Sequence, residues 1–138
     1  MSREEKTVLV VDDEEALRDL TARLIAKRGY QILTAGDGAE ALALLAGGAR
    51  VDLVVLDVMM PGVDGLQTLE QIRARGYTRL PVVLLTAQTN DDQILGGYKS
   101  GADCYITKPL QPSTLLNVVD YLIGDLPPAE RARIEQLL

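Results

Sequence analysis

The chain has 138 residues, which is enough for one domain with a buried core and too few for two well-packed domains. It is 47% hydrophobic and 25% charged, as ordinary globular proteins are, so disordered and fibrous classes are excluded. The net charge of -6 disfavours direct nucleic-acid binding, because such binding depends on Lys and Arg side chains that neutralise phosphates.

The number of cysteines and the first residues of the chain indicate the cellular compartment in which the protein is expected. The single cysteine, Cys104, cannot form an internal disulfide, and the first six residues are charged where a secretory signal would be apolar. These features predict a reducing, cytoplasmic location. No apolar stretch is long enough to cross a bilayer, so we expect no membrane insertion.

Five short apolar or β-branched runs alternate along the chain with longer segments of helical period. The runs that predict strands are Val8–Val11, Gln31–Thr34, Leu53–Leu56, Val82–Leu85 and Cys104–Thr107. This alternation is typical of parallel strands joined by crossover helices. Because such crossovers are right-handed, helices are expected on both faces of a single sheet.

Apolar residues at helical spacing predict three of the helices and the face that each one buries. These residues are Leu17, Leu20 and Leu24; Leu66, Leu69 and Ile72; and Leu115, Val118, Val119 and Leu122. Two helix starts are marked by a capping residue followed three positions later by a polar side chain. These pairs are Asp64 with Gln67, and Asn90 with Gln93.

The second strand region, Tyr30–Ala35, is the most polar one and is therefore expected at an edge of the sheet. This placement gives the strand order 2-1-3-4-5, in which a ligand crevice lies outside the carboxyl ends of strands one and three. After Gly124, the pair Pro127-Pro128 predicts a break and then a short helix with Ile134, Leu137 and Leu138. That helix is too short to be stable without packing. We expect one domain over residues 5–124 and an extension over 125–138.

Three carboxylates follow the two strands that border the expected crevice. Asp12 and Asp13 end the first strand, and Asp57 ends the third. Two like charges ~5 Å apart repel by roughly 3 kcal/mol at an effective dielectric of ~20, so this cluster needs a cation or shared protons. Hard oxygen ligands in an open crevice suit Mg²⁺. In the alternative reading, such acids only cap the helices that follow, as Asp13 and Glu14 can do.

A hydroxyl and an ammonium group are expected on the same rim. Thr86 ends the fourth strand, and Lys108 follows the fifth. A phosphorylated carboxylate requires such donors, because the charge on the phosphoryl oxygens must be met by fixed donors and metal. Asp57 is then the nucleophile that forms an acyl phosphate. The Lys108-Pro109 bond is a candidate cis peptide that would aim the lysine inward. Taken singly, Thr86 and Lys108 are also compatible with a strand end and a surface charge.

Four segments in order along the chain resemble the receiver domain of two-component response regulators. They are VLVVDDEE at Val8–Glu15, LVVLDVMMPGVDG at Leu53–Gly65, VVLLTA at Val82–Ala87 and GADCYITKP at Gly101–Pro109. The resemblance runs from about Thr7 to Gly124 and implies a doubly wound, flavodoxin-like α/β fold. The strand order given above is also that of this fold, so the two expectations are not independent.

The resemblance implies a role for each matching residue. Asp57 would be the phosphoacceptor, Asp12 and Asp13 the acidic pocket, and Asp13, Asp57 and the backbone carbonyl of Met59 the ligands of Mg²⁺. Thr86 and Lys108 would bind the phosphoryl oxygens. Tyr105 would be the switch aromatic that moves inward with Thr86, and its alternative is an ordinary strand aromatic. Met59 and Gln88 would border the path of water to the acyl phosphate and so tune its lifetime.

The implied partners are a sensor histidine kinase or phosphotransfer protein and a downstream protein target. The target would bind the face formed by the fourth helix, the fifth strand and the fifth helix, over residues 91–123. Gly96-Gly97 would ease rearrangement of the fourth helix. The fifth helix carries only Asp120 as a charge, which weighs against a charge-paired dimer. The chain would act alone on a partner or be the receiver piece of a longer protein.

Other function classes fit the sequence less well. A flavin carrier of this fold needs a Ser, Thr and Gly loop after the first strand, where two acids would repel the cofactor phosphate. An aspartate-nucleophile phosphatase has a D-x-D arrangement after its first strand, whereas the acids here are adjacent. The P-loop pattern is absent. The remaining alternative to a phosphorylated switch is a receiver-like docking domain that is not phosphorylated. We expect a switch rather than an enzyme, apart from its part in phosphotransfer and slow autodephosphorylation.

Overall fold

The computed structural model describes residues 5–58, 65–86, 101–124 and 126–136. The capping residues Asp64 and Asn90, the predicted fourth helix with Gly96-Gly97, and Leu137 and Leu138 lie outside these ranges. Within the described residues, no helix is long and apolar enough to span a bilayer.

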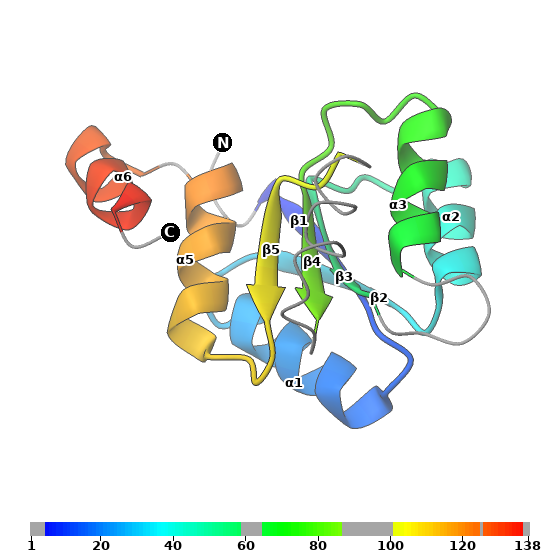
Figure 1. Cartoon of the computed structure of the whole chain (residues 1–138), viewed down its shortest axis with the longest axis horizontal. Coiled ribbons are helices and arrows are strands. Elements are labelled where there is room, and N and C mark those ends of the chain that lie inside the picture. Colours follow the sequence, from blue (N-terminus) through cyan, green and yellow to red (C-terminus); the bar gives the residue numbers. More distant parts are fainter. Residues whose placement is uncertain (1–4, 59–64, 87–100, 125, 137–138) are drawn as a thin grey trace.

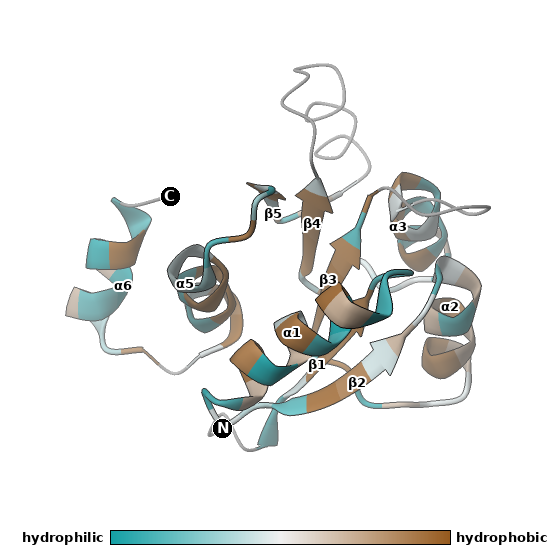
Figure 2. Cartoon of the chain, turned by 90° about the horizontal axis from the view of Figure 1, so that it is seen from below, coloured by the Kyte–Doolittle hydropathy of each residue, from teal (hydrophilic) through white to brown (hydrophobic). Residues whose placement is uncertain are grey.

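Five parallel strands form one sheet in the order β2-β1-β3-β4-β5, which confirms the predicted order. The strands are β1 (Thr7–Val11), β2 (Gln31–Ala35), β3 (Leu53–Asp57), β4 (Val82–Thr86) and β5 (Cys104–Thr107). All residues of β3 and β4 are buried, as in a strand covered on both faces. In Figure 2, β3 and β4 carry hydrophobic colours along most of their length, whereas the edge strand β2 also shows pale and hydrophilic sections.

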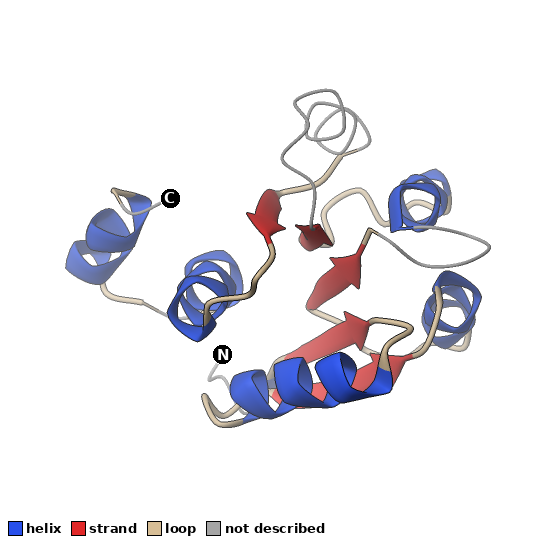
Figure 3. Ribbon diagram, turned by 60° about the horizontal axis from the view of Figure 1, so that its bottom comes forward, coloured by secondary structure: helices blue, strands red, loops and turns tan. Residues whose placement is uncertain are grey.

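Helices cover both faces of the sheet, as the crossover rule predicts (Figures 1 and 3). α1 (Glu15–Ala26) and α5 (Pro112–Ile123) lie on one face, and α2 (Gly38–Ala46) and α3 (Gly65–Ala74) lie on the other. Each face has its own core. Ile25 and Val118 belong to the first core, and Ala41 and Leu69 belong to the second. The sheet is thus the middle of three layers, and its loops gather at the two strand ends.

The buried face of α1 differs from the predicted one. Leu20 is 52% exposed, and Leu17 and Leu24 are only half-buried, whereas Thr21 and Ile25 are fully buried. Successive residues on a helix are about 100° apart, so the stripe through Thr21 and Ile25 adjoins the leucine stripe. The spacing of apolar residues identified the helix but not which of its faces turns toward the sheet. That choice follows from the core shared with β1 and α5, to which Ile25 belongs.

The one charged residue of α5, Asp120, is buried and bound within the domain. Asp120 is 2% exposed and accepts a hydrogen bond from the Tyr30 hydroxyl at 2.5 Å. Its other carboxylate oxygen is paired with Arg28, at the end of α1. Asp120 is therefore a buried link between α5, α1 and the start of β2, and not a surface charge available to a partner.

The last described helix, α6 (Pro128–Glu135), follows Pro127 and lies beside α5 on the side away from the sheet (Figures 1 and 3). Ile134 is 4% exposed. The Arg131 guanidinium lies 4.4 Å from the centre of the Tyr121 ring and donates to the Tyr121 carbonyl oxygen at 2.7 Å. The Tyr121 hydroxyl donates to Glu135 at 3.0 Å. These contacts supply the packing that so short a helix requires.

Candidate functional site

The site is built at the carboxyl ends of β1 and β3, which are adjacent in the sheet. Asp12 follows β1 and Asp57 is the last residue of β3; each is 2% exposed, whereas Asp13 is exposed. One oxygen from each of the three carboxylates lies within 4.8 Å of the others. The predicted convergence of Asp12, Asp13 and Asp57 is therefore present in the structure.

The surroundings of Asp12 raise its pKa. Burial raises the pKa of Asp12 from 3.8 to about 6; the Glu14 backbone N–H, which donates to Oδ1 at 2.9 Å, opposes this rise, and the Asp57 carboxylate adds to it. Its second oxygen, Oδ2, is buried and has no hydrogen-bond partner among the described residues. A buried, partnerless carboxylate oxygen is costly unless a proton or a cation meets it.

This donor set fits a divalent cation. The carboxylates provide hard oxygen ligands, one of them exposed and two of them buried, so that an ion can keep waters on its open side. A cation would also meet the partnerless oxygen of Asp12 and offset the mutual repulsion of the acids. Mg²⁺, which binds through few carboxylates and retains several waters, suits such an open group better than Zn²⁺, which prefers nitrogen and sulfur.

The Lys108 ammonium group reaches Asp57 from the residue that follows β5, two strands away from β3 in the sheet. Lys108 Nζ lies 3.3 Å from Asp57 Oδ1, and the Lys108 backbone N–H donates to the Thr86 carbonyl oxygen at 2.6 Å. The Lys108-Pro109 peptide bond is cis, as predicted. Thr86 is fully buried at the end of β4, directly between β3 and β5. The Lys108 ammonium group therefore lies against Asp57, and Thr86 ends the strand between β3 and β5.

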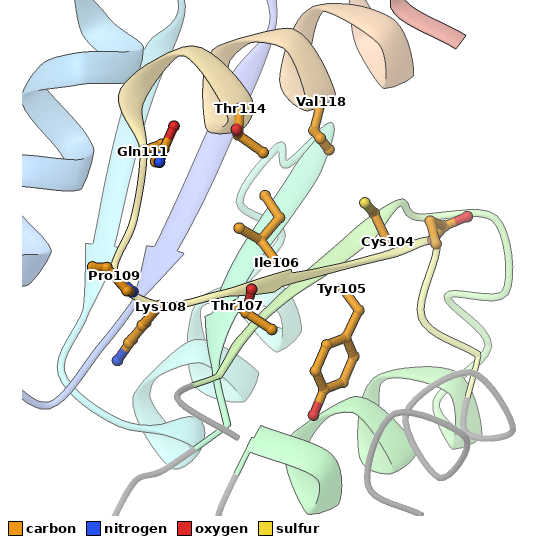
Figure 4. A pocket seen from close by; sticks show the side chains of 10 residues that line it. Cys104, Tyr105, Ile106, Thr107, Lys108, Pro109, Gln111, Thr114 and Val118 are labelled. Atoms are coloured by element: carbon orange, nitrogen blue, oxygen red, sulfur yellow. The ribbon is translucent and has the colours of Figure 1, made fainter. Parts of the chain in front are cut away.

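Tyr105 lies in the middle of β5. Figure 4 shows its ring on the side of the strand away from α5, whereas Ile106 and Cys104 point toward α5. The ring packs against the core that contains Leu69 of α3 and Leu84 of β4. In the sheet, Tyr105 pairs with Leu84 of β4, two residues before Thr86. Its role as a switch residue stays a prediction.

Two predicted residues, Met59 and Gln88, lie outside the described residues. Two others were missed. Arg18 Nη1 donates to the Asp12 carbonyl oxygen at 3.0 Å and so braces the turn after β1. Gly65 begins α3 where a Cβ would meet the backbone of Asp57. Gly65 could have been identified from the sequence, because it is the last residue of the segment LVVLDVMMPGVDG. No sequence feature indicates that the Arg18 side chain binds the Asp12 carbonyl oxygen.

Comparison with known proteins gives one consistent result. A family model described as the response regulator receiver domain matches residues 8–120. The response regulator MprA of Mycobacterium sp. (strain KMS) is 42% identical over 123 residues, which cover 89% of this chain and 53% of that protein. The transcriptional regulatory protein YvrH of Bacillus subtilis (strain 168) is 42% identical over 113 residues, which cover 81% of this chain and 46% of that protein.

A solved structure shares the fold. The chemotaxis protein CheY4 of Vibrio cholerae superposes with a TM-score of 0.80 at 34% identity, covering 86% of this chain and 98% of that one. The chain spans about half the length of the curated relatives it matches.

Proposed function

The chain belongs to the receiver domain family of response regulators, and we propose that it is a phosphoacceptor switch in which Asp57 accepts a phosphoryl group from a histidine kinase or phosphotransfer protein. The family places the chain in two-component signalling, where response regulators receive phosphoryl groups from histidine kinases. The observation that carries the proposal is the environment of Asp57. It is a buried carboxylate with an ammonium group 3.3 Å away and two further acids beside it.

In the proposed transfer, an Asp57 carboxylate oxygen attacks the phosphorus of a phosphohistidine. An O–P bond forms, the N–P bond breaks, and the histidine keeps the electron pair and takes up a proton. Lys108 and the Thr86 hydroxyl would stabilise the negative charge on the phosphoryl oxygens. Asp12, Asp13, Asp57 and the Met59 carbonyl would hold Mg²⁺, which supplies charge neutralisation when bound.

The proposed output is a conformational change. Engagement of Thr86 with the phosphoryl group would shift Tyr105, and with it the surface formed by the fourth helix, β5 and α5. A downstream protein that binds this surface is the proposed target. YvrH is called a transcriptional regulatory protein, and a similar output domain is a proposal for any longer protein that contains this chain. Direct nucleic-acid contact is disfavoured by the net charge of the full chain, which is -6.

The test is labelling with acetyl phosphate and Mg²⁺, followed by intact mass measurement. We expect one added phosphate in the wild type and in Asp19→Asn, an exposed acid of α1, and none in Asp57→Asn. Chelation of Mg²⁺ should abolish the label, because Lys108 alone cannot offset three acids that face an incoming phosphate. Equal labelling of Asp57→Asn would refute the assignment. A wild type that is never labelled would favour the docking-domain alternative.

A further inference from the structure

β5 is the shortest strand of the described sheet. It has four residues, lies at the edge of the sheet, and is paired with β4 in the register Val83↔Cys104 to Thr86↔Thr107. Ile106 is its one fully buried residue, whereas every residue of β4 is buried. A short edge strand with little burial specifies its register weakly, so another feature must hold β5 in place.

The register of β5 decides what reaches Asp57. A shift by one residue would move Lys108 by about 3.3 Å along the sheet and exchange the faces of Tyr105 and Ile106. The Lys108–Asp57 separation is itself 3.3 Å, so the ion pair would be lost. Figure 4 shows Lys108 directly after β5, and the side chains of Tyr105 and Ile106 on opposite sides of the strand. The positions of all three side chains therefore depend on the register of β5.

The opposite end of β5 is tied down by Asp103. Its backbone N–H donates to the Val82 carbonyl oxygen at 2.9 Å, and its Oδ2 accepts from the Val82 N–H at 2.9 Å. Two hydrogen bonds thus join the residue before β5 to the first residue of β4. The same carboxylate oxygen accepts from Arg73 Nη2 at 3.1 Å.

Arg73, in the last turn of α3, holds the loop that leads into β5. It makes five hydrogen bonds, to Gly101 O twice, to Tyr77 O, to Leu80 O and to Asp103. Its side chain is only 16% exposed. Gly101 has a φ of 100°, and a Cβ there would lie 2.9 Å from Arg73 Nε, so the loop passes close over the guanidinium. A planar guanidinium can serve acceptors on several sides at once, as a lysine ammonium cannot.

We propose that Arg73 and Asp103 are positioning residues that set the register of β5 and thereby hold Lys108 within reach of Asp57 from the other end of the strand. The inference deepens the proposed function and rests on it. Neither residue touches the phosphoryl group. Their effect on the site passes through Lys108, and this dependence separates a positioning role from general support of the fold.

The experiment measures the affinity of beryllofluoride, a phosphoryl mimic, in Mg²⁺ by ¹⁹F NMR titration. The variants are Asp103→Asn and Arg73→Met, each in the wild-type and in the Lys108→Ala background. Arg75→Met, at an exposed position just after α3, is the matched control. Melting temperatures are recorded for all, and Asp103→Asn carries the test if Arg73→Met does not fold.

We expect each variant to weaken binding roughly threefold to thirtyfold in the wild-type background and by less than about twofold once Lys108 is gone. Arg75→Met should leave the affinity unchanged. An equal loss in both backgrounds, or no loss in the wild-type background, would overturn the positioning role and leave the proposed function intact. A wild type that does not bind beryllofluoride, with Asp57→Asn behaving identically, would overturn both.

Discussion

A Cβ atom at Gly65 would lie 2.3 Å from the backbone carbonyl oxygen of Asp57 and 2.6 Å from the Cα atom of Val58. The Gly65 N–H donates to the Val58 carbonyl oxygen at 3.0 Å, so the first residue of α3 rests directly on the end of β3. Both obstructing groups are backbone atoms, one in the last residue of the fully buried strand β3 and one in the buried residue that follows it, and cannot move aside as a side chain can. The proposed phosphoacceptor and α3 therefore share a contact that only glycine permits.

Gly65→Ala is expected to lower the free energy of unfolding by about 1–3 kcal/mol, because the clash must displace either α3 or the end of β3. Phosphorylation at Asp57 should slow as well, since the end of β3 carries the acceptor. Gly36→Ala is the matched control, because its Cβ would meet only side-chain atoms of Arg18 and Glu40 at 3.4 Å. Denaturant titration and acetyl phosphate labelling measure the two effects; equal stability of the two variants would contradict this prediction.

The pKa of Asp12 makes the stability of the metal-free protein depend on pH. Burial raises the pKa from 3.8 to about 6, so the folded state binds this proton more tightly than the unfolded state does. The stabilisation is complete below pH ~4 and is lost as the pH rises through ~6. Asp12→Asn should therefore gain stability relative to the wild type between pH 4 and 7, by at most about 3 kcal/mol.

Thermal unfolding in EDTA across this pH range measures the difference. Asp19→Asn, an exposed position of α1, is the control and should follow the wild type. Addition of millimolar Mg²⁺ at pH 7 should raise the melting temperature of the wild type more than that of Asp12→Asn, because a bound ligand stabilises the folded state. A stability difference that does not change with pH would show that Asp12 is not perturbed as described.

The buried Tyr30–Asp120 hydrogen bond is expected to contribute measurably to stability. Its acceptor is a carboxylate that is 2% exposed, and hydrogen bonds to charged groups contribute roughly 1.5–3 kcal/mol. Tyr30→Phe should lower the free energy of unfolding by about this amount and leave labelling of Asp57 intact. Tyr121→Phe, which removes an exposed hydrogen bond to Glu135, should change the free energy of unfolding much less than Tyr30→Phe does. Similar costs for the two variants would rule out the link through Asp120.

Helix α6 is expected to undock without unfolding the rest of the domain. Ile134 is its one buried residue, and eight residues cannot form a stable helix alone. Ile134→Ala should cost no more than about 1–2 kcal/mol, because the loss is limited by the docking free energy of α6. Hydrogen exchange over residues 128–135 should become fast while the melting temperature falls little. Arg133→Ala, at an exposed position of α6, should preserve protection, and a large fall in melting temperature with Ile134→Ala would contradict a separable helix.

The lifetime of the acyl phosphate is predicted from two residues outside the described ranges. Met59 is bulky and apolar and would shield the phosphoryl group, and Gln88 is a poor general base. The double variant Met59→Asn with Gln88→Glu should speed decay roughly tenfold, or about 1–2 kcal/mol in the barrier, by admitting and orienting a water. Loss of label after removal of the donor gives the rate. A wild-type half-life of seconds, or a double variant that decays no faster, would show that other groups control the decay.

Several features were predictable from the sequence because they depend on the order of elements. Alternating strands and helices with right-handed crossovers leave few topologies, and a polar second strand places β2 at the edge. Once the order was known, residues at the carboxyl ends of neighbouring strands had to converge, which is why Asp12, Asp13 and Asp57 lie within 4.8 Å of one another. The cis Lys108-Pro109 bond follows from local chemistry of the same kind.

Other features were decided only by the packing of distant segments. Helical spacing identified α1, but whether the Leu20 or the Ile25 stripe faces the sheet depends on the shape of the core that α5 helps to form. The sequence shows Asp120 as the one charge on α5, but not that Arg28 and Tyr30, about ninety residues earlier, bind it in the folded chain. The sequence around Arg73 gives no sign of its five hydrogen bonds, because three of them go to Gly101 and Asp103, which reach Arg73 only when the chain before β5 returns to α3. The period of apolar residues is a local property of the sequence, and strand order follows from the few topologies that the order of elements allows. The hydrogen-bond partner of a side chain, in contrast, depends on which distant segments the folded chain brings together.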